Sequence, residues 1–166
     1  SVSAVGSVRA WQSGGVLFAD TLVLAARTGS MNAAGRITIV DSTQDMTIRA
    51  GWYTYSRDDS LAVVSRQPVL TKGQGDTAVV VTADSMRLDE RSRRAAAWGN
   101  VRIDRGNLSA ECDEVVYDDE LEILSLQGQP RAVQRTESDT ASSATVSQLF
   151  GDRITLFIEG TRVYQI

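Results

Sequence analysis

The chain has 166 residues, 42% hydrophobic and 23% charged, which are the proportions of a globular domain with a real core. Its formal net charge of −4 and isoelectric point near 4.8 argue against a nucleic-acid binder, because no basic surface is present to displace counterions from phosphates. Histidine is absent, so His-dependent nucleophile pairs and His-containing metal sites are absent too, and the single Cys112 cannot form an intrachain disulfide.

Targeting segments are also missing from the sequence. No apolar run approaches the length of roughly 18 residues that a membrane helix needs. The start at Ser1 has neither the basic nor the apolar region of a signal peptide, and it is not Met. We therefore expect the chain to be a processed or trimmed piece of a longer protein whose export signal lies elsewhere.

Two kinds of strand alternate along the chain. One begins with Gly or Pro, and the other contains Ala-Asp or a close variant followed by alternating apolar residues. In chain order the pairs are Gly6-Ser7-Val8 with 19–24, Gly35–Ile39 with 50–55, Pro68–Leu70 with 83–88, Gly99–Ile103 with 112–117, and Pro130–Val133 with 151–156. We call the first residue of each Ala-Asp motif its anchor. The anchors are Ala19, Ala50, Ala83, Cys112 and Gly151, and successive anchors lie 31, 33, 29 and 39 residues apart. A repeat near 31 residues is typical of stacked, similar units.

Each anchored strand changes phase at its centre. Apolar residues stand at the anchor and two positions before it, and then at three and five positions after it. Such a shift needs a bulge or bend, and the step between the two phases holds Asp20, Gly51, Asp84, Asp113 and Asp152. Asp and Gly suit a bend because they tolerate unusual dihedrals or bond nearby amides.

These patterns predict an all-β, antiparallel meander of about ten or more long bent strands, joined by polar turns. One polar, Ser/Thr-rich segment, 136–145, lengthens the last spacing, and we expect it to be a flexible loop. The first strand (Val5–Trp11) and the last strand (Asp152–Tyr164) are the expected open edges.

At this point the chain resembles the OstA/LptA (organic solvent tolerance) family, which carries lipopolysaccharide across the periplasm of Gram-negative bacteria toward the outer membrane. The resemblance spans residues 6–160 and is carried by Gly99–Ile103, Leu108–Ala110, Asp113–Tyr117, Leu126–Pro130, Gln67-Pro68 and Gly151–Ile154. It implies a single domain over residues 1–166, folded as a half-open β-jellyroll, or β-taco. In that fold two sheets form a V with an apolar interior.

The resemblance also implies a periplasmic, non-enzymatic lipid-binding bridge without cofactor, metal or nucleic acid. Its partners would be the lipid A acyl chains of lipopolysaccharide, and other jellyroll domains or further copies of itself, bound head-to-tail through edge strands. The residues expected to line the lipid groove are Leu22, Leu24, Tyr53, Tyr55, Met86, Leu88, Val115, Tyr117, Ile154 and Leu156.

Other interpretations of the same residues stay open. The apolar columns could simply fill a core, as in a structural or adhesive β-repeat module without ligand. A polysaccharide-acting β-helix enzyme is disfavoured, because no acidic pair stands out on a strand face. The Asp column could suggest calcium, although it lacks the Gly-Gly-x-Gly-x-Asp spacing of calcium β-rolls. Arg91, Arg93 and Arg94 could meet lipid phosphates or form a solvated turn. The interior volume between the sheets discriminates the lipid groove from the solid core.

Overall fold

The computed structural model describes residues 1–12, 15–136, 145–159 and 162–165. Within these ranges the fold is all-β and antiparallel, with one short 3-10 turn, η1 (Gly75–Thr77). The first eight strands are β1 (Val2–Gln12), β2 (Gly15–Ala25), β3 (Ser30–Asp41), β4 (Met46–Ser56), β5 (Leu61–Ser65), β6 (Val69–Lys72), β7 (Val79–Thr82) and β8 (Ser85–Asp89). The rest are β9 (Arg94–Arg105), β10 (Leu108–Asp118), β11 (Ile123–Gln127), β12 (Arg131–Thr136), β13 (Thr145–Phe150), β14 (Arg153–Glu159) and β15 (Arg162–Gln165).

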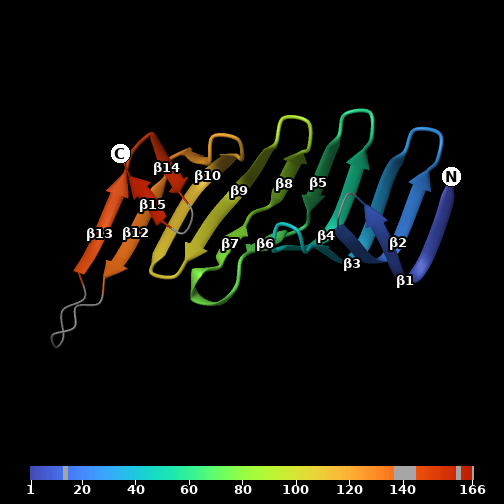
Figure 1. Cartoon of the computed structure of the whole chain (residues 1–166), viewed down its shortest axis with the longest axis horizontal. Helices are drawn as coiled ribbons and strands as arrows, with labels where there is room; N and C mark the ends of the chain where they lie inside the picture. Colours follow the sequence, from blue (N-terminus) through green and yellow to red (C-terminus); the bar gives the residue numbers. More distant parts are fainter. Residues whose placement is uncertain (13–14, 137–144, 160–161, 166) are drawn as a thin grey trace.

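The long strands bend midway, so that the two halves of each strand belong to two facing walls. The upper wall contains the upper strand halves in Figure 1: the 2–5, 21–25, 30–34, 52–56, 94–98 and 114–118 segments with β5, β8, β11, β14 and β15. The lower wall contains the 8–12, 15–19, 37–41, 46–50, 101–105 and 108–112 segments with β6, β7, β12 and β13. The result is a half-open β-jellyroll.

The predicted phase switch is confirmed by the strand register. Pairing of β2 with β3 shifts between Phe18 and Thr21, and pairing of β10 with β9 shifts between Cys112 and Glu114. In β5–β6, β7–β8, β11–β12 and β13–β14 the bend breaks the strand altogether, with Pro68 and Pro130 buried at two of these breaks. The four breaks divide eleven long strands into fifteen within the described chain, in agreement with the predicted ten or more.

Three of the bends pack an aspartate over a glycine in the next strand or at its end, whereas the neighbour of Gly51 is Arg66. A Cβ placed on Gly35, Gly99 or Gly128 would lie 2.3–2.4 Å from a carboxyl oxygen of Asp20, Asp84 or Asp113, respectively. All three glycines have positive φ, which other residues adopt at a cost. The aspartates therefore serve as bend-forming residues, and glycine is needed opposite them for both space and dihedral.

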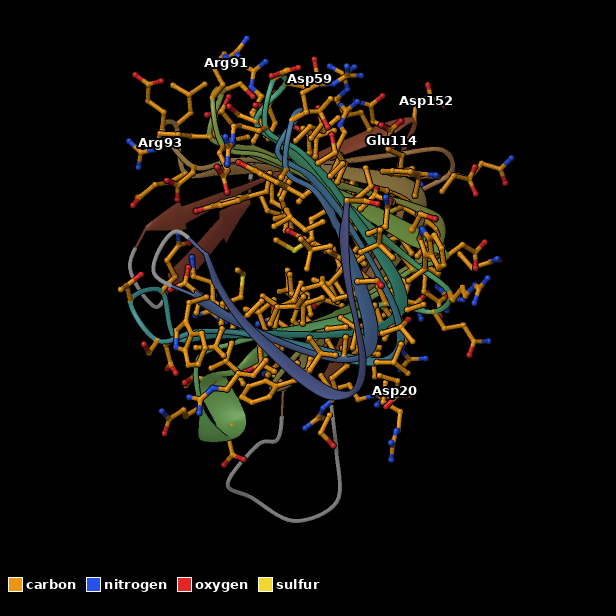
Figure 2. The ribbon with its side chains drawn as sticks, turned by 90° about the vertical axis from the view of Figure 1, so that its right-hand side faces the viewer. Asp20, Asp59, Arg91, Arg93, Glu114 and Asp152 are labelled. Carbon is orange, nitrogen blue, oxygen red and sulfur yellow. The ribbon has the colours of Figure 1, made fainter. Side chains whose placement is uncertain are left out.

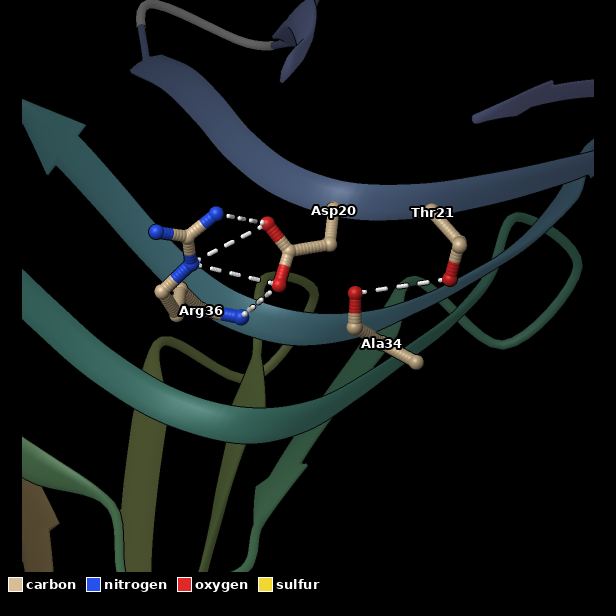
Figure 3. Close-up of polar contacts among 4 residues, drawn as sticks. All are labelled: Asp20, Thr21, Ala34 and Arg36. Carbon is tan, nitrogen blue, oxygen red and sulfur yellow. Dashed lines mark hydrogen bonds and ion pairs between the residues drawn. The ribbon is translucent and has the colours of Figure 1, made fainter. Parts of the chain in front are cut away.

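The first of these bends shows how the aspartate is held (Figure 3). The backbone N–H of Arg36 donates to Asp20 Oδ2 at 3.1 Å, and its guanidinium Nη2 donates to Asp20 Oδ1 at 2.9 Å. Beside them, the Thr21 hydroxyl donates to the carbonyl of Ala34 at 3.4 Å. At another bend the Asn100 side-chain amide donates to Asp84 Oδ2 at 3.0 Å. The bonds tie neighbouring strands together on the outer side of the V.

The ends of the sheet differ in part from the expectation. β1 pairs with β2 alone and is an edge, as predicted. The predicted last strand, Asp152–Tyr164, is wrong as an edge, because it divides into β14 and β15, and β14 lies inside the sheet between β11 and β15. At that end β15 and β13 each have one described partner (Figure 1). The β12–β13 hairpin, which contains most of the predicted strand Pro130–Val133, completes the lower wall.

The segment 136–145, predicted to be a flexible loop, differs from that prediction at its two ends. Thr136 and Thr145 pair with each other as the last residues of β12 and the first of β13, so they belong to strands and not to a loop. The remaining part of the predicted loop, 137–144, lies outside the described residues.

Candidate functional site

The two walls enclose an apolar interior. In the end-on view the ribbon wraps around carbon-rich side chains, whereas Asp20, Asp59, Arg91, Arg93, Glu114 and Asp152 point outward (Figure 2). Alternation along each strand causes this division, since every second side chain faces the other wall. Among the described residues no polar or charged side chain is buried.

A cavity of about 320 Å³ lies in this interior near the middle of the chain. Protein ligand pockets range from about 300 to 1,000 Å³, so the space is large enough for part of a ligand. The lower wall contributes Ile48, Leu70, Val79, Val81 and Ile103 to its lining. The upper wall contributes Met86, Leu88, Ala95, Ala97, Val115, Tyr117 and Leu124.

Small side chains on β9 explain why a cavity forms here. Ala97 lies in register between Met86 of β8 and Val115 of β10, and Ala95 lies between Leu88 and Tyr117. Two methyl groups therefore stand where the neighbouring strands carry long side chains. The facing strands β6 and β7 carry leucine and valine, which do not reach across to fill the gap.

Four of the ten residues expected to line a groove line this cavity: Met86, Leu88, Val115 and Tyr117. Tyr53, Ile154 and Leu156 are buried in the core, and Leu22 and Tyr55 pack against it, all outside the cavity lining. Leu24 is half-buried on β2. The structure thus brings together the central members of both columns and leaves the outer members as packing residues of the same interior.

From the sequence we did not predict the cavity-lining residues of the lower wall or the charged residues at the rim of the cavity. Ile48 and Val81 stood in the apolar column two positions before the anchor, which was the available signal for the facing wall. Lys72 and Arg105 border the cavity at the ends of β6 and β9, beside Gly73 and Thr77. Nothing in the repeat pattern singles out these two cations.

One contact joins the walls at the rim. Lys72 Nζ, on the lower wall, lies 5.7 Å from the ring centroid of Tyr117 on the upper wall. The Tyr117 hydroxyl donates to Asp119 Oδ1 at 3.2 Å, and burial, followed by the charge of Asp119, raises the pKa of Tyr117. The phenol is therefore neutral near pH 7 and presents a ring face to the ammonium group.

The arginines proposed to meet phosphates are engaged in the turn between β8 and β9. Arg93 and Arg94 form ion pairs with Asp119 and Asp118, and the Arg91 guanidinium donates to the carbonyl of Asp58. Their partners are neighbouring turns, which supports the structural interpretation of this basic patch.

Other reactive or ligating groups are sparse. Cys112 is buried, and desolvation raises its thiol pKa to about 11. In the described ranges no three His, Cys, Asp or Glu residues gather as a group able to hold a metal ion. The same ranges contain no helix with the length and hydropathy needed to cross a membrane.

Comparison with known proteins places the fold. No protein-family model matches the chain. No curated protein matches it in sequence. Among solved structures, the chain is similar to LptH from Pseudomonas aeruginosa, described as the LptA homologous periplasmic component of the conserved lipopolysaccharide transport device. The TM-score is 0.61 at 11% identity, with 81% of this chain and 93% of that chain covered. At this identity the similarity shows a common fold.

Proposed function

We propose that this protein is a periplasmic lipid-binding bridge module that shields the acyl chains of lipopolysaccharide between its two walls and passes the lipid toward the outer membrane. The observation that carries the proposal is the apolar cavity of about 320 Å³ between the walls, in a fold similar to a lipopolysaccharide transport component. A solid core, which a purely structural or adhesive module would have, does not account for that space.

In this mechanism no bond is made or broken. Hydrocarbon leaves water for the interior, and each Å² of apolar surface removed from water contributes about 25 cal/mol. The phosphorylated sugar head stays in solvent at the open side of the V. The direction of lipid movement has to be set by another component, because an apolar groove alone favours neither end.

The proposed lining extends beyond the cavity. Leu22, Tyr53, Tyr55, Ile154 and Leu156 face the same interior on either side of it. A continuous groove would require these side chains to move apart, so that the cavity joins both ends of the V. Edge strands at the two ends would then pair with a similar jellyroll domain or a second copy, which would continue the groove between modules.

A carboxylate placed on the inner or on the outer face of the upper wall tests the proposal. Leu88→Asp places a carboxylate in the cavity, where it must be desolvated or protonated, and should weaken binding of a fluorescent lipopolysaccharide about tenfold or more. Val116→Asp is the matched control, because Val116 is an aliphatic residue of the same wall that alternates with Val115 and lies outside the cavity lining. Thermal melting of both variants separates lost binding from unfolding. Equal binding by both folded variants, or no binding by the parent protein, would instead favour the structural module.

A further inference from the structure

The charged residues around the cavity all carry one sign, although the protein is acidic overall. The chain has 21 acidic and 17 basic residues, yet the charged lining residues are Lys72, Arg87 and Arg105. Arg87 is exposed between the inward-facing Met86 and Leu88, which leaves Lys72 and Arg105 at the rim. An apolar cavity bordered by cations is complementary to a molecule with a hydrocarbon chain and an anionic head.

Lys72 is placed so that it can exchange its present contact for a stronger one. Its ammonium group faces the Tyr117 ring at 5.7 Å and, within the described part of the chain, forms no ion pair. A partly exposed cation–π contact is weaker than a charge-assisted hydrogen bond to an oxyanion. An arriving oxyanion would therefore draw Lys72 away from Tyr117 and open the rim above the cavity.

The acidic residues near Lys72 are held by hydrogen bonds of nearby turns and loops. Asp41 Oδ1 accepts hydrogen bonds from the Thr43 hydroxyl at 2.6 Å and from the backbone N–H groups of Thr43 and Gln44. Asp45 Oδ1 accepts from the Gln74 side chain at 3.3 Å. These bonds direct Asp41 toward its own turn and Asp45 toward the loop that follows β6. The hydrogen bond from Thr43, and to a smaller extent the charge of Lys72, lower the pKa of Asp41, but Lys72 forms no ion pair with it in the described part of the chain.

We propose that Lys72 forms the core of a head-group site for the phosphate or carboxylate of an amphiphile whose hydrocarbon chain occupies the cavity. The inference rests on the proposed function and adds a chemical requirement to it: the rim selects an oxyanion, and Lys72 leaves the ring of Tyr117 when the oxyanion binds.

Calorimetric titration with amphiphiles that share a dodecyl chain tests the site. The probes are dodecyl phosphate, neutral dodecyl maltoside and cationic dodecyltrimethylammonium, each below its micelle concentration. Dodecyl phosphate should bind tightest. Lys72→Gln should weaken its binding about tenfold, as expected for loss of one charge-assisted hydrogen bond, and leave dodecyl maltoside unchanged. Lys72→Arg should retain the preference, and inorganic phosphate alone should not displace dodecyl phosphate.

Arg49→Gln is the matched control, since it removes the same charge from an exposed residue of β4 outside the cavity lining. Equal losses in Lys72→Gln and Arg49→Gln would overturn the head-group site in favour of general charge attraction. Equal affinity for the phosphate and maltoside probes would also overturn it and leave the proposed function intact. Failure of every dodecyl probe to bind would contradict both. Displacement by inorganic phosphate alone would reveal a plain anion site.

Discussion

The carboxyl group of Asp84 lies directly over Gly99: the Asp84 N–H donates to the Gly99 carbonyl at 2.8 Å, and a Cβ on Gly99 would lie 2.4 Å from Asp84 Oδ2. The same aspartate-over-glycine contact recurs at Gly35 and Gly128. It is the local device at three of the bends between the upper wall and the lower wall. The V-shaped interior therefore depends on these bends.

Gly99→Ala should destabilise the protein by about 2–4 kcal/mol, since it adds a positive-φ cost to a clash with Asp84. Urea unfolding measures the change. Gly6→Ala is the control, because Gly6 has φ +99 with open space around its missing Cβ, and it should cost only about 1 kcal/mol. A second substitution, Asp84→Ala, should recover part of the loss in Gly99→Ala. Equal costs at Gly6 and Gly99 would show that the aspartate contact is unimportant.

Acid should remove the contribution of the Asp118–Arg94 pair. The hydrogen bond from Arg94, and then the N–H of Leu121, hold the pKa of Asp118 below its ordinary value. A lowered folded-state pKa means that stability is present above about pH 4, the unfolded value, and is lost as pH falls through the folded value. The difference in free energy of unfolding between the parent and Asp118→Asn should be largest at neutral pH and should vanish in strong acid.

Asp152→Asn removes the same charge from an exposed carboxylate and serves as the reference for that titration. Chemical denaturation at a series of pH values gives both curves. If the difference in free energy of unfolding between the parent and Asp118→Asn stays constant down to strong acid, the Asp118–Arg94 pair does not stabilise the fold.

Cys112 should react slowly in the native protein. Burial raises its thiol pKa from 9.0 to about 11, so roughly a hundredth of the ordinary thiolate is present at pH 8. Iodoacetamide modification, followed by mass spectrometry, should be about a hundredfold slower than in urea. Modification at equal rates in both conditions would place Cys112 outside the core.

Edge pairing should depend on β1. Val5 is 84% exposed on this edge strand, and Leu121, 61% exposed in the β10–β11 turn, is a comparable apolar residue away from it. A lysine on an edge discourages strand addition. Val5→Lys should therefore reduce concentration-dependent association in sedimentation, whereas Leu121→Lys should not. A strict monomer at high concentration would rule out self-association.

The bends were predictable from sequence, and the cavity was not. A phase change in the apolar columns requires a bulge wherever it occurs, and Asp84 and Gly99 are the residue types that form one. The cavity depends instead on which side chains fail to fill the space between walls. Ala95 and Ala97 mark that place, but alternation treats alanine and leucine as equivalent inward positions, so the residues facing them could not be inferred.

The rim and the sheet ends depended on long-range pairing. Lys72 meets Tyr117 across the V, 45 residues away in the chain, and no local pattern carries such a contact. The β12–β13 hairpin likewise follows from pairing of β12 with β10, which the spacing of the repeat does not reveal. Local sequence patterns therefore predicted that the elements are strands and where they bend. The strand order and the cavity depend on long-range strand pairing, which those patterns do not contain.

Site-specific photo-crosslinking tests the central claim most directly. A photoreactive residue at Met86 or Val115, both in the cavity lining, should capture lipopolysaccharide. The same residue at Val116 should capture far less, because Val116 alternates with Val115 and faces away from the interior. Strong capture at Met86 and Val115 with little at Val116 is the predicted result. Equal capture from both faces, or none from a folded protein, would contradict an interior lipid track.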